Sequence, residues 1–311
     1  MLPGIMNVRA YRSVDPAVQA WQDGTPTVLF KGDCIEILRS IPDESVNLIV
    51  TSPPYCMGKE YEDSYSIEDF VATHQRVLPD IVRVVKPGGS ICWQVGYHVA
   101  DKCAYPLDYA VFEILSKYKE FSLRNRIIWT FGHGLHGRRR FSGRHEIVLW
   151  FTKGDHYYFD LDAVRVPQKY PGKRHYKGKQ KGEFSGNPKG KNPSDVWEIP
   201  NVKANHIEKI GHPCQFPVGL AERCVRALCP KTGVVLDPFM GSASTGVAAI
   251  ANKRRFLGAE TNDKYFQIAH KRLVMAYGKK VPYRPADLPI YAPNEREAVA
   301  RRPGHFVEVS L

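Results

Sequence analysis

The sequence contains no CxxC pair, no internal repeat and no apolar run long enough to span a membrane. Its seven cysteines are scattered and odd in number (Cys34, Cys56, Cys92, Cys103, Cys214, Cys224 and Cys229). This pattern argues against a disulfide-stabilised secreted fold and against a zinc site of the usual spacing. The N-terminus also lacks the charged-then-apolar pattern of a secretory leader. These absences predict a reduced protein of the cytoplasm, without a membrane segment.

Acidic residues are relatively few. The 311 residues include 32 Asp and Glu against 44 Lys and Arg, which gives a formal net charge of +12. Hydrophobic residues make up 43% of the chain, enough for one large core and a smaller appended region. The positive surplus favours a polyanionic partner, because neutralised phosphates release counterions. A merely basic, solvated surface is the alternative.

Predicted strands and helices alternate along most of the chain. Apolar and β-branched runs predict strands at residues 27–31, 45–50, 90–95, 126–131, 146–151, 234–236 and 256–259. Apolar residues at helical spacing predict helices at residues 34–40, 67–85, 218–228 and 245–251. This alternation is typical of an α/β fold with a doubly wound, mostly parallel, Rossmann-like sheet.

Composition divides the chain into five parts. They are an N-terminal arm (1–26), two halves of the α/β domain (27–153 and 212–279), an insertion between them (154–211) and a charged C-terminal tail (280–311).

The insertion is the most basic part of the chain. Residues 165–211 contain 11 Lys and Arg against 4 Asp and Glu, a surplus of 7, and they lack long apolar runs. A disordered linker would have this composition too. Tyr170, Trp197 and Ile199 favour an ordered, substrate-facing insertion instead.

The segment Ser52-Pro53-Pro54-Tyr55 closes a buried strand. Its two prolines stiffen the loop and leave carbonyl oxygens without neighbouring backbone donors. The Ser52 hydroxyl and the Pro53 carbonyl could accept both hydrogens of a planar amino group, while Tyr55 stacks on an attached base. An ordinary proline-rich strand exit with a core tyrosine is the alternative.

The segment Asp237-Pro238-Phe239-Met240-Gly241-Ser242 closes another strand and precedes a helix. Ligands of doubly wound sheets lie at such strand ends, where glycine lets the backbone approach closely. Glu260 ends the next strand, 19 residues after Gly241, and is placed to bind ribose hydroxyls. Since the spacing is not G-x-G-x-x-G and no Walker lysine follows, dinucleotides and ATP are less favoured. An ordinary strand-loop-helix turn is the alternative.

Together the two segments resemble the DNA amino-methyltransferases that use S-adenosylmethionine, specifically the permuted group with the catalytic motif first. The likeness runs from about Val28 to about Leu273. Ser52-Pro53-Pro54-Tyr55 matches the motif that binds the target base. The later segment is similar to D-P-F-x-G-S-G, with Ala243 in place of the second glycine.

The resemblance implies further cofactor residues. Asp33 matches the acid that binds the adenine amino group of the cofactor. His212, Pro213 and Phe216 fall in a segment similar to H-P-x-x-x-P, beside the methionine end. The family places its target-recognition region where the basic insertion lies, and the resemblance also suggests a homodimer. The large basic insertion favours double-stranded DNA as partner. A base within a duplex cannot reach such a pocket, so base flipping is implied.

The target base is less clearly indicated. Serine at the first motif position occurs in enzymes that act on cytosine N4, whereas Asp or Asn usually accompanies adenine N6. The continuation Gly58-Lys59-Glu60-Tyr61-Glu62-Asp63 resembles adenine-modifying members. We therefore favour adenine N6 over cytosine N4.

Basic residues outside the motifs are candidates for DNA contact. Arg138, Arg139, Arg140 and Arg144 surround Phe141 in a loop that could clamp phosphates, although a solvated charged loop is the alternative. The insertion contributes Lys173, Arg174, Lys177, Lys179 and Lys181. His133, His136 and His145 match no usual metal spacing and are interpreted as polar loop residues.

Two other classes of function remain open from the sequence alone. One keeps the chemistry but acts on RNA or on a protein glutamine amide, because such a pocket also accepts these planar amino groups. The other is a DNA-binding protein without catalysis, which the two intact motifs disfavour.

Overall fold

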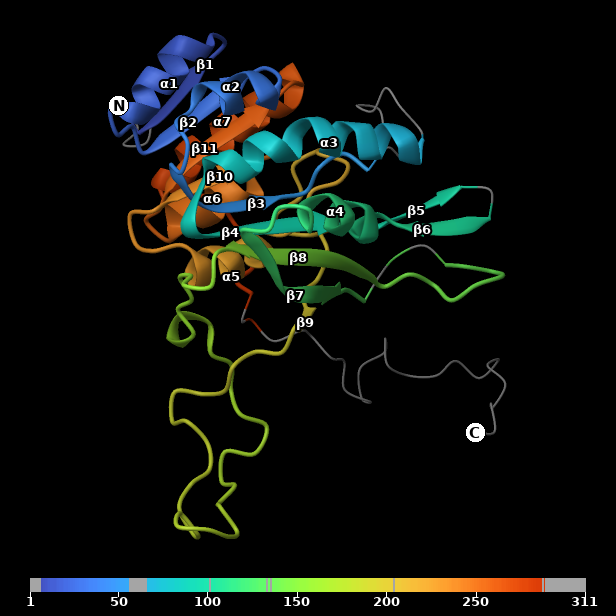
Figure 1. The fold of residues 1–311 in the computed structure, drawn as a ribbon, viewed down its shortest axis with the longest axis vertical. Helices are drawn as coiled ribbons and strands as arrows, with labels where there is room; N and C mark the ends of the chain where they lie inside the picture. Colours follow the sequence, from blue (N-terminus) through green and yellow to red (C-terminus); the bar gives the residue numbers. More distant parts are fainter. Residues whose placement is uncertain are drawn as a thin grey trace.

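The computed structural model describes residues 7–55, 66–100, 102–132, 134, 136–203, 205–286 and 288. Its centre is a nine-stranded sheet (Figure 1). In spatial order the strands are β1 (Val8–Tyr11), β2 (Thr27–Lys31), β11 (Arg255–Glu260), β10 (Val234–Asp237), β3 (Val46–Thr51), β4 (Val85–Val95), β8 (His145–Lys153), β7 (Phe121–Thr130) and β9 (Val196–Glu198). The six strands from β1 to β4 are parallel, and β8 is antiparallel to both β4 and β7.

Helices cover both faces of the sheet. The first face carries α1 (Val14–Gln22), α2 (Cys34–Ser40), α3 (Ile67–Val84) and α4 (Leu107–Leu115), and the second carries α5 (Val218–Leu228), α6 (Ser244–Ala251) and α7 (Asp263–Tyr277). Alternate residues of one strand enter different hydrophobic cores: Phe30 packs with the first set of helices and Leu29 with the second. This is the period-two pattern of a strand buried on both faces. The expected doubly wound α/β fold is confirmed.

The chain reverses its winding direction between β10 and β3. From β3 the chain proceeds through α3 to the neighbouring strand β4 on one side, whereas from β10 it proceeds through α6 to β11 on the other side. β10 and β3 are themselves adjacent and parallel, with Leu236 opposite Ile49. Both predicted motifs follow directly from the carboxyl ends of these two strands. They therefore lie at the switch point, where doubly wound sheets bind ligands.

The described part of the predicted N-terminal arm, residues 7–26, belongs to the body of the α/β domain instead. Val8–Tyr11 is β1, which pairs in parallel with β2 and forms an edge of the sheet. α1 follows it and buries Ala17, Ala20 and Trp21. Pro16 lies in the first turn of α1, where a backbone N–H has no intrahelical partner anyway. The short strand, only partly buried, gave little periodic signal.

The other predicted elements are present, although β4 and β7 each begin five residues earlier than predicted. β2, α2 and α5 have the expected bounds. The segment Lys86-Pro87-Gly88-Gly89 follows α3 as expected, but it belongs to β4, which begins at Val85 directly after the helix. A small hairpin of β5 (Tyr97–Ala100) and β6 (Cys103–Pro106) lies beyond β4. Within the described ranges, no helix is long and apolar enough to cross a bilayer.

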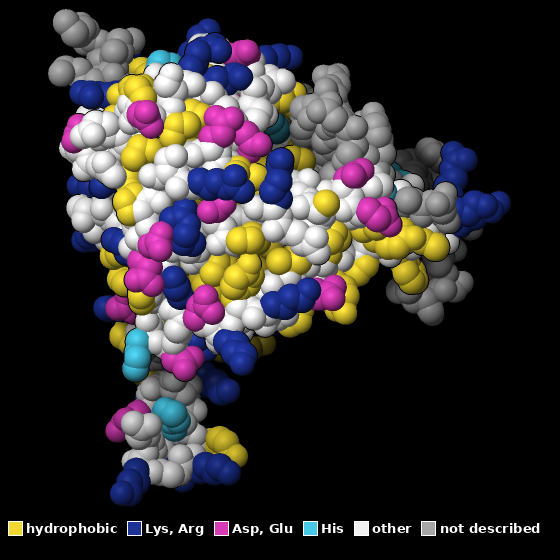
Figure 2. All heavy atoms as spheres, turned by 45° about the horizontal axis from the view of Figure 1, so that its top comes forward, with side chains coloured by type: hydrophobic (Ala, Val, Ile, Leu, Met, Phe, Trp, Pro, Cys, Tyr) yellow, Lys and Arg dark blue, Asp and Glu magenta, His cyan; other side chains and the backbone are white. Residues whose placement is uncertain are grey.

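The basic insertion divides into a projecting part and a packed part. Residues 165–195 extend from the body as an irregular two-stranded arm (Figure 1), joined by bridges such as Val166 to Lys191. Lys and Arg side chains surround the end of this projection (Figure 2). After it, β9 pairs with β7 at the sheet edge, and Trp197 and Ile199 are buried. The expected insertion, 154–211, is thus longer than the part that projects.

Candidate active site

One cavity of about 800 Å³ opens at the carboxyl ends of β3 and β10. Residues of both predicted motifs line it, including Ser52, Tyr55, Gly241 and Glu260. Its size is in the upper part of the range of small-molecule sites. The parallel pairing of the two strands explains this convergence, since it brings segments nearly 190 residues apart in the chain to the same edge.

The Ser-Pro-Pro-Tyr segment lines this cavity with all four of its residues, Ser52, Pro53, Pro54 and Tyr55. The Ser52 hydroxyl lies 3.4 Å from the Tyr55 hydroxyl. The Tyr55 ring is half-buried and packs against the hydrophobic core of the first face. Burial raises the pKa of Tyr55 well above its ordinary value, so its hydroxyl stays protonated at neutral pH.

The position of Tyr55 is fixed by two residues that were not among the predicted site residues. Gln94 near the end of β4 donates from Nε2 to the Tyr55 hydroxyl at 2.6 Å, and Tyr55 donates to Glu146 of β8 at 3.3 Å. Gln94 also donates to Glu146. Burial raises the pKa of Glu146. A signal for Gln94 was present in the sequence, because it is the one polar residue in the apolar run from Ile91 to Val95.

In the second motif, Gly241 brings its backbone to the cavity. Gly241 has φ +49°, and a Cβ there would lie 2.9 Å from Nε2 of His212. Its N–H donates to Glu260 Oε2 at 3.0 Å, while Asn262 N–H donates to Oε1 at 2.7 Å. Burial raises the pKa of Glu260. Ala243, in place of the usual glycine, also adopts a left-handed conformation, with φ +60°.

Asp237 and Ser242 lie behind the cavity wall. Asp237 is fully buried and accepts a 2.6 Å hydrogen bond from the Thr51 hydroxyl, which joins the ends of β10 and β3. Burial raises the pKa of Asp237 to about 7. Ser242 is buried too, and its carbonyl accepts from Arg272 at 3.0 Å. Both residues therefore support the loop, whereas Pro238 and Phe239 line the cavity.

The remaining predicted cofactor residues also line the cavity. They are Asp33, His212, Pro213 and Phe216. Asp33 is the N-cap of α2: its carboxylate accepts from Ile35 N–H at 3.0 Å. The Arg76 guanidinium of α3 lies 3.4 Å from the same carboxylate. The His212 ring packs on Tyr265, with 4.4 Å between centroids. Burial and the nearby Lys209 and Arg272 lower the pKa of His212 to about 4.

The basic residues predicted to contact DNA lie outside the cavity lining. Arg138, Arg139, Arg140 and Arg144 belong to the loop between β7 and β8, and Lys173, Arg174, Lys177, Lys179 and Lys181 belong to the projecting arm. Exposed aromatic residues accompany them: Arg174 lies 4.0 Å from the centroid of the Phe184 ring. The segment Gly58–Asp63 and His133 lie outside the described residues.

Comparison with known proteins gives the family. The family model for DNA methylases of the N6/N4 type matches residues 46–271. The type II methyltransferase M.BglII of Bacillus subtilis is 46% identical over 246 residues, covering 79% of this chain and 68% of the relative. M.ScaI of Streptomyces caespitosus is 37% identical, covering 81% and 83%. The DNA adenine methyltransferase YhdJ of Escherichia coli (strain K12) is 31% identical, covering 80% and 83%.

Solved structures agree with this result. The PvuII DNA methyltransferase, described as cytosine-N4-specific, matches with a TM-score of 0.63 and 18% identity. The match covers 92% of this chain and 98% of the PvuII chain. At this identity the likeness concerns the fold alone. The DNA modification methylase TTHA0409 of Thermus thermophilus, complexed with S-adenosyl-L-methionine, has a TM-score of 0.54 and 29% identity, covering 80% and 95%. The chain belongs to the family of S-adenosylmethionine-dependent DNA methyltransferases that act on exocyclic amino groups, adenine N6 or cytosine N4.

Proposed function

We propose that this protein methylates N6 of adenine within a specific sequence of double-stranded DNA. The observation that supports this most is the shared cavity, which joins the base-binding motif at Ser52–Tyr55 to the glycine loop at Gly241. Methyl transfer requires an amine and a methyl donor to be held in line, and a single cavity at the switch point allows it.

The residues at the second motif fit S-adenosylmethionine. The backbone at Gly241 leaves no room for a side chain, and the Glu260 carboxylate is fixed by two backbone N–H groups at the cavity wall. Glu260 would hold the ribose hydroxyls, Asp33 the adenine amino group, and the His212 segment the methionine end. When bound, the cofactor supplies an electrophilic methyl group.

The base would enter on the Tyr55 side of the cavity. The Ser52 hydroxyl and the Pro53 carbonyl accept the two amino hydrogens, which draws the nitrogen lone pair out of the ring. Tyr55 stacks on the base, and its own hydroxyl is held by Gln94 and Glu146. Because a base within a duplex cannot reach a cavity of this kind, the reaction requires base flipping.

Adenine is favoured over cytosine by sequence similarity. A relative named as a DNA adenine methyltransferase is 31% identical over 253 residues. Serine at position 52 can accept from either amine, so it does not distinguish the two bases.

A duplex substrate is favoured by the distribution of charge. The arm at residues 165–195 and the loop at residues 138–144 both present exposed cations, and both leave the body of the protein. Phosphate contacts of this kind position a duplex without reading its sequence. A homodimer remains a prediction, which sedimentation analysis would test.

The proposal is tested by incubating purified protein with tritiated S-adenosylmethionine and, separately, duplex DNA, RNA and a glutamine-containing protein. Label is expected in DNA, and mass spectrometry of the nucleosides is expected to identify N6-methyladenine. N4-methylcytosine would correct the base, and label in RNA or protein would overturn the substrate. DNA binding without any label would indicate a silent binding protein. Sequencing of modified bases then gives the recognition site.

A further inference from the structure

The loop between β7 and β8 begins and ends beside the candidate active site. Trp129 and Phe131, at its start, line the cavity, and so does Glu146, two residues after its end at Arg144. Phe131 N–H donates to the Arg144 carbonyl at 3.0 Å, which closes the base of the loop. The two ends of the loop therefore lie at the cavity, and its tip projects from the same end of the sheet (Figure 1).

The tip of the loop carries a phenylalanine in an unusual place. Phe141 is fully exposed, with a relative exposure of 101%. Burial of an apolar ring is favourable, so a partner that covers Phe141 would gain binding energy. Arg138, Arg139 and Arg140 precede it directly. This combination of cations and an exposed ring suits a partner with both negative charge and an apolar surface, as phosphates and stacked bases of a duplex provide.

The hairpin of β5 and β6 packs against the loop. Gly143 packs so closely on Tyr97 of β5 that a Cβ there would lie 1.8 Å from the tyrosine hydroxyl oxygen. The Arg140 guanidinium lies 5.9 Å from the centroid of the same ring. Gly137 N–H also donates to the Ser142 hydroxyl at 3.1 Å across the tip. The loop and the hairpin extend together from one end of the sheet (Figure 1).

From these placements we infer that Phe141 is a wedge that enters the duplex and occupies the space vacated by the target base, while the flanking arginines hold the adjacent phosphates. This inference rests on the proposed function, since it assigns a role within DNA methylation. Apolar side chains that separate stacked bases are a known way of deforming a duplex. Stacking of Phe141 on the remaining bases compensates for the stacking that the extruded base loses. Phe141 acts on the equilibrium of base extrusion and is a positioning residue.

The test compares two duplexes that carry the recognition site found by sequencing. In one the target base is fully paired, and in the other it faces an abasic position, so that extrusion costs less. For Phe141→Ala, kcat/KM on the paired duplex is expected to fall roughly ten- to a hundredfold, the range that loss of one base–aromatic stack gives. On the unpaired duplex the loss is expected to be less than about threefold, because less extrusion energy remains to be supplied. Phe141→Trp is expected to retain activity on both.

Tyr109→Ala is the matched control, because Tyr109 is an exposed aromatic residue of α4, with a relative exposure of 63%. It is expected to leave both rates unchanged. Fluorescence of 2-aminopurine at the target position is expected to rise with the wild type and to rise less with Phe141→Ala. An equal loss on both duplexes, or no loss on either, would overturn the wedge while methylation by the wild type continues. A wild type that methylates neither duplex would overturn the proposed function itself.

Discussion

Tyr55 lies at the centre of a polar cluster, and its ring and its hydroxyl have separable contributions. Tyr55→Ala removes both, and we expect single-turnover methyl transfer to fall by roughly a hundredfold, since a base–aromatic stack is worth about 1–3 kcal/mol and the contact to Gln94 is lost as well. Tyr55→Phe keeps the ring and should lose less. Ser52→Ala should also reduce turnover strongly. Normal turnover in both alanine variants would contradict the proposed base pocket.

Glu260 has a different role, because its carboxylate is held by the backbone of the glycine loop. Glu260→Ala removes the acceptor of the Gly241 and Asn262 N–H groups together with the ribose contact. Hydrogen bonds to charged groups contribute about 1.5–3 kcal/mol, so we expect affinity for S-adenosylmethionine to fall by roughly ten- to a hundredfold. Calorimetric titration measures it. Ser52→Ala is the control and should bind the cofactor normally; equal weakening in both variants would refute the division of roles.

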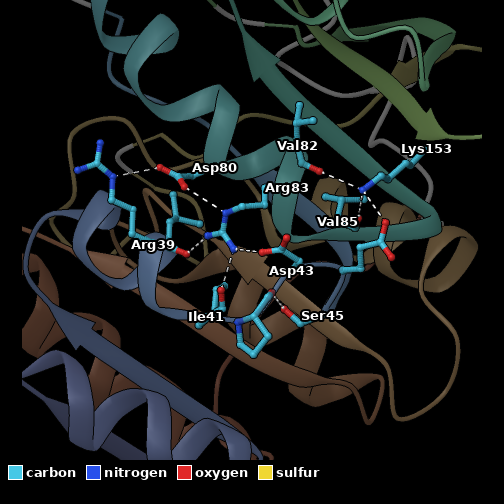
Figure 3. A network of polar contacts seen from close by, with 12 residues as sticks. Arg39, Ile41, Asp43, Ser45, Asp80, Val82, Arg83, Val85 and Lys153 are labelled. Atoms are coloured by element: carbon cyan, nitrogen blue, oxygen red, sulfur yellow. Dashed lines mark hydrogen bonds and ion pairs between the residues drawn. The ribbon is translucent and has the colours of Figure 1, made fainter.

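Among the elements, α3 fixes both α2 and the start of β3. Arg83 of α3 donates to the Leu38 carbonyl at 2.6 Å, to the Ile41 carbonyl at 3.0 Å and to Asp43 at 2.6 Å (Figure 3). Carbonyls at a helix C-terminus have no intrahelical partner, and a planar guanidinium can satisfy several at once. The same network holds α2, which Asp33 caps, beside the segment that leads into β3 and on to Ser52.

Arg83→Met should therefore lower the free energy of unfolding by about 1–3 kcal/mol, because it leaves these carbonyls without their donor. Urea denaturation measures the change. Arg39→Met is the control: Arg39 has only a 3.5 Å contact to Asp80, and its side chain is 68% exposed. We expect that change to stay within about 0.5 kcal/mol. Similar losses in the two variants would mean that Arg83 contributes no more than a surface ion pair.

His74 of α3 introduces a pH dependence into the packing of α3 on β4. Its Nε2 accepts from Trp93 at 3.1 Å and its Nδ1 lies 2.8 Å from the Phe70 carbonyl, which is the geometry of a neutral ring. Burial lowers the pKa of His74 to about 4. In the unfolded chain His74 binds a proton below about pH 6.5. The contribution of neutral His74 to folding stability is therefore present above that pH and is lost as the pH falls towards 4.

Asp237 affects the pH dependence of stability in the opposite direction. Its pKa is raised to about 7, so the folded state binds the proton more tightly than the unfolded chain does. His212, with a pKa lowered to about 4, acts in the same direction as His74. The difference between the wild type and His74→Gln isolates His74. We expect the variant to be less stable at neutral pH and the gap to narrow by up to about 1.4 kcal/mol per pH unit between 6.5 and 4. A constant gap in denaturation experiments would contradict this expectation.

At the scale of the whole molecule, the sequence predicts those parts of the structure that depend on local residues or on a motif that defines a loop. The bounds of α5 follow from its helical pattern, and the adjacency of Ser52 and Gly241 follows from the topology of a doubly wound sheet. The pairing of Gln94 with Glu146 is different in kind. It depends on the antiparallel register of β4 and β8, which neither strand specifies alone. β1 was not predicted, because a four-residue edge strand leaves most of its side chains outside the core and so shows no hydrophobic pattern.

The arm gives the molecule an extended basic surface, and its effect on DNA binding should scale with the number of its charges. Each lysine that contacts a phosphate contributes about 0.9 to the slope of log K against log salt concentration. Replacing four exposed arm lysines with glutamine should therefore flatten the slope by up to about 3.6 units; these are Lys173, Lys177, Lys179 and Lys181. Fluorescence anisotropy with a labelled duplex measures it. A matched set replaces four exposed lysines outside the arm, namely Lys231, Lys264, Lys271 and Lys279, and it should leave the slope nearly unchanged. Equal flattening by both sets would show that net charge, and not the arm, contacts the duplex.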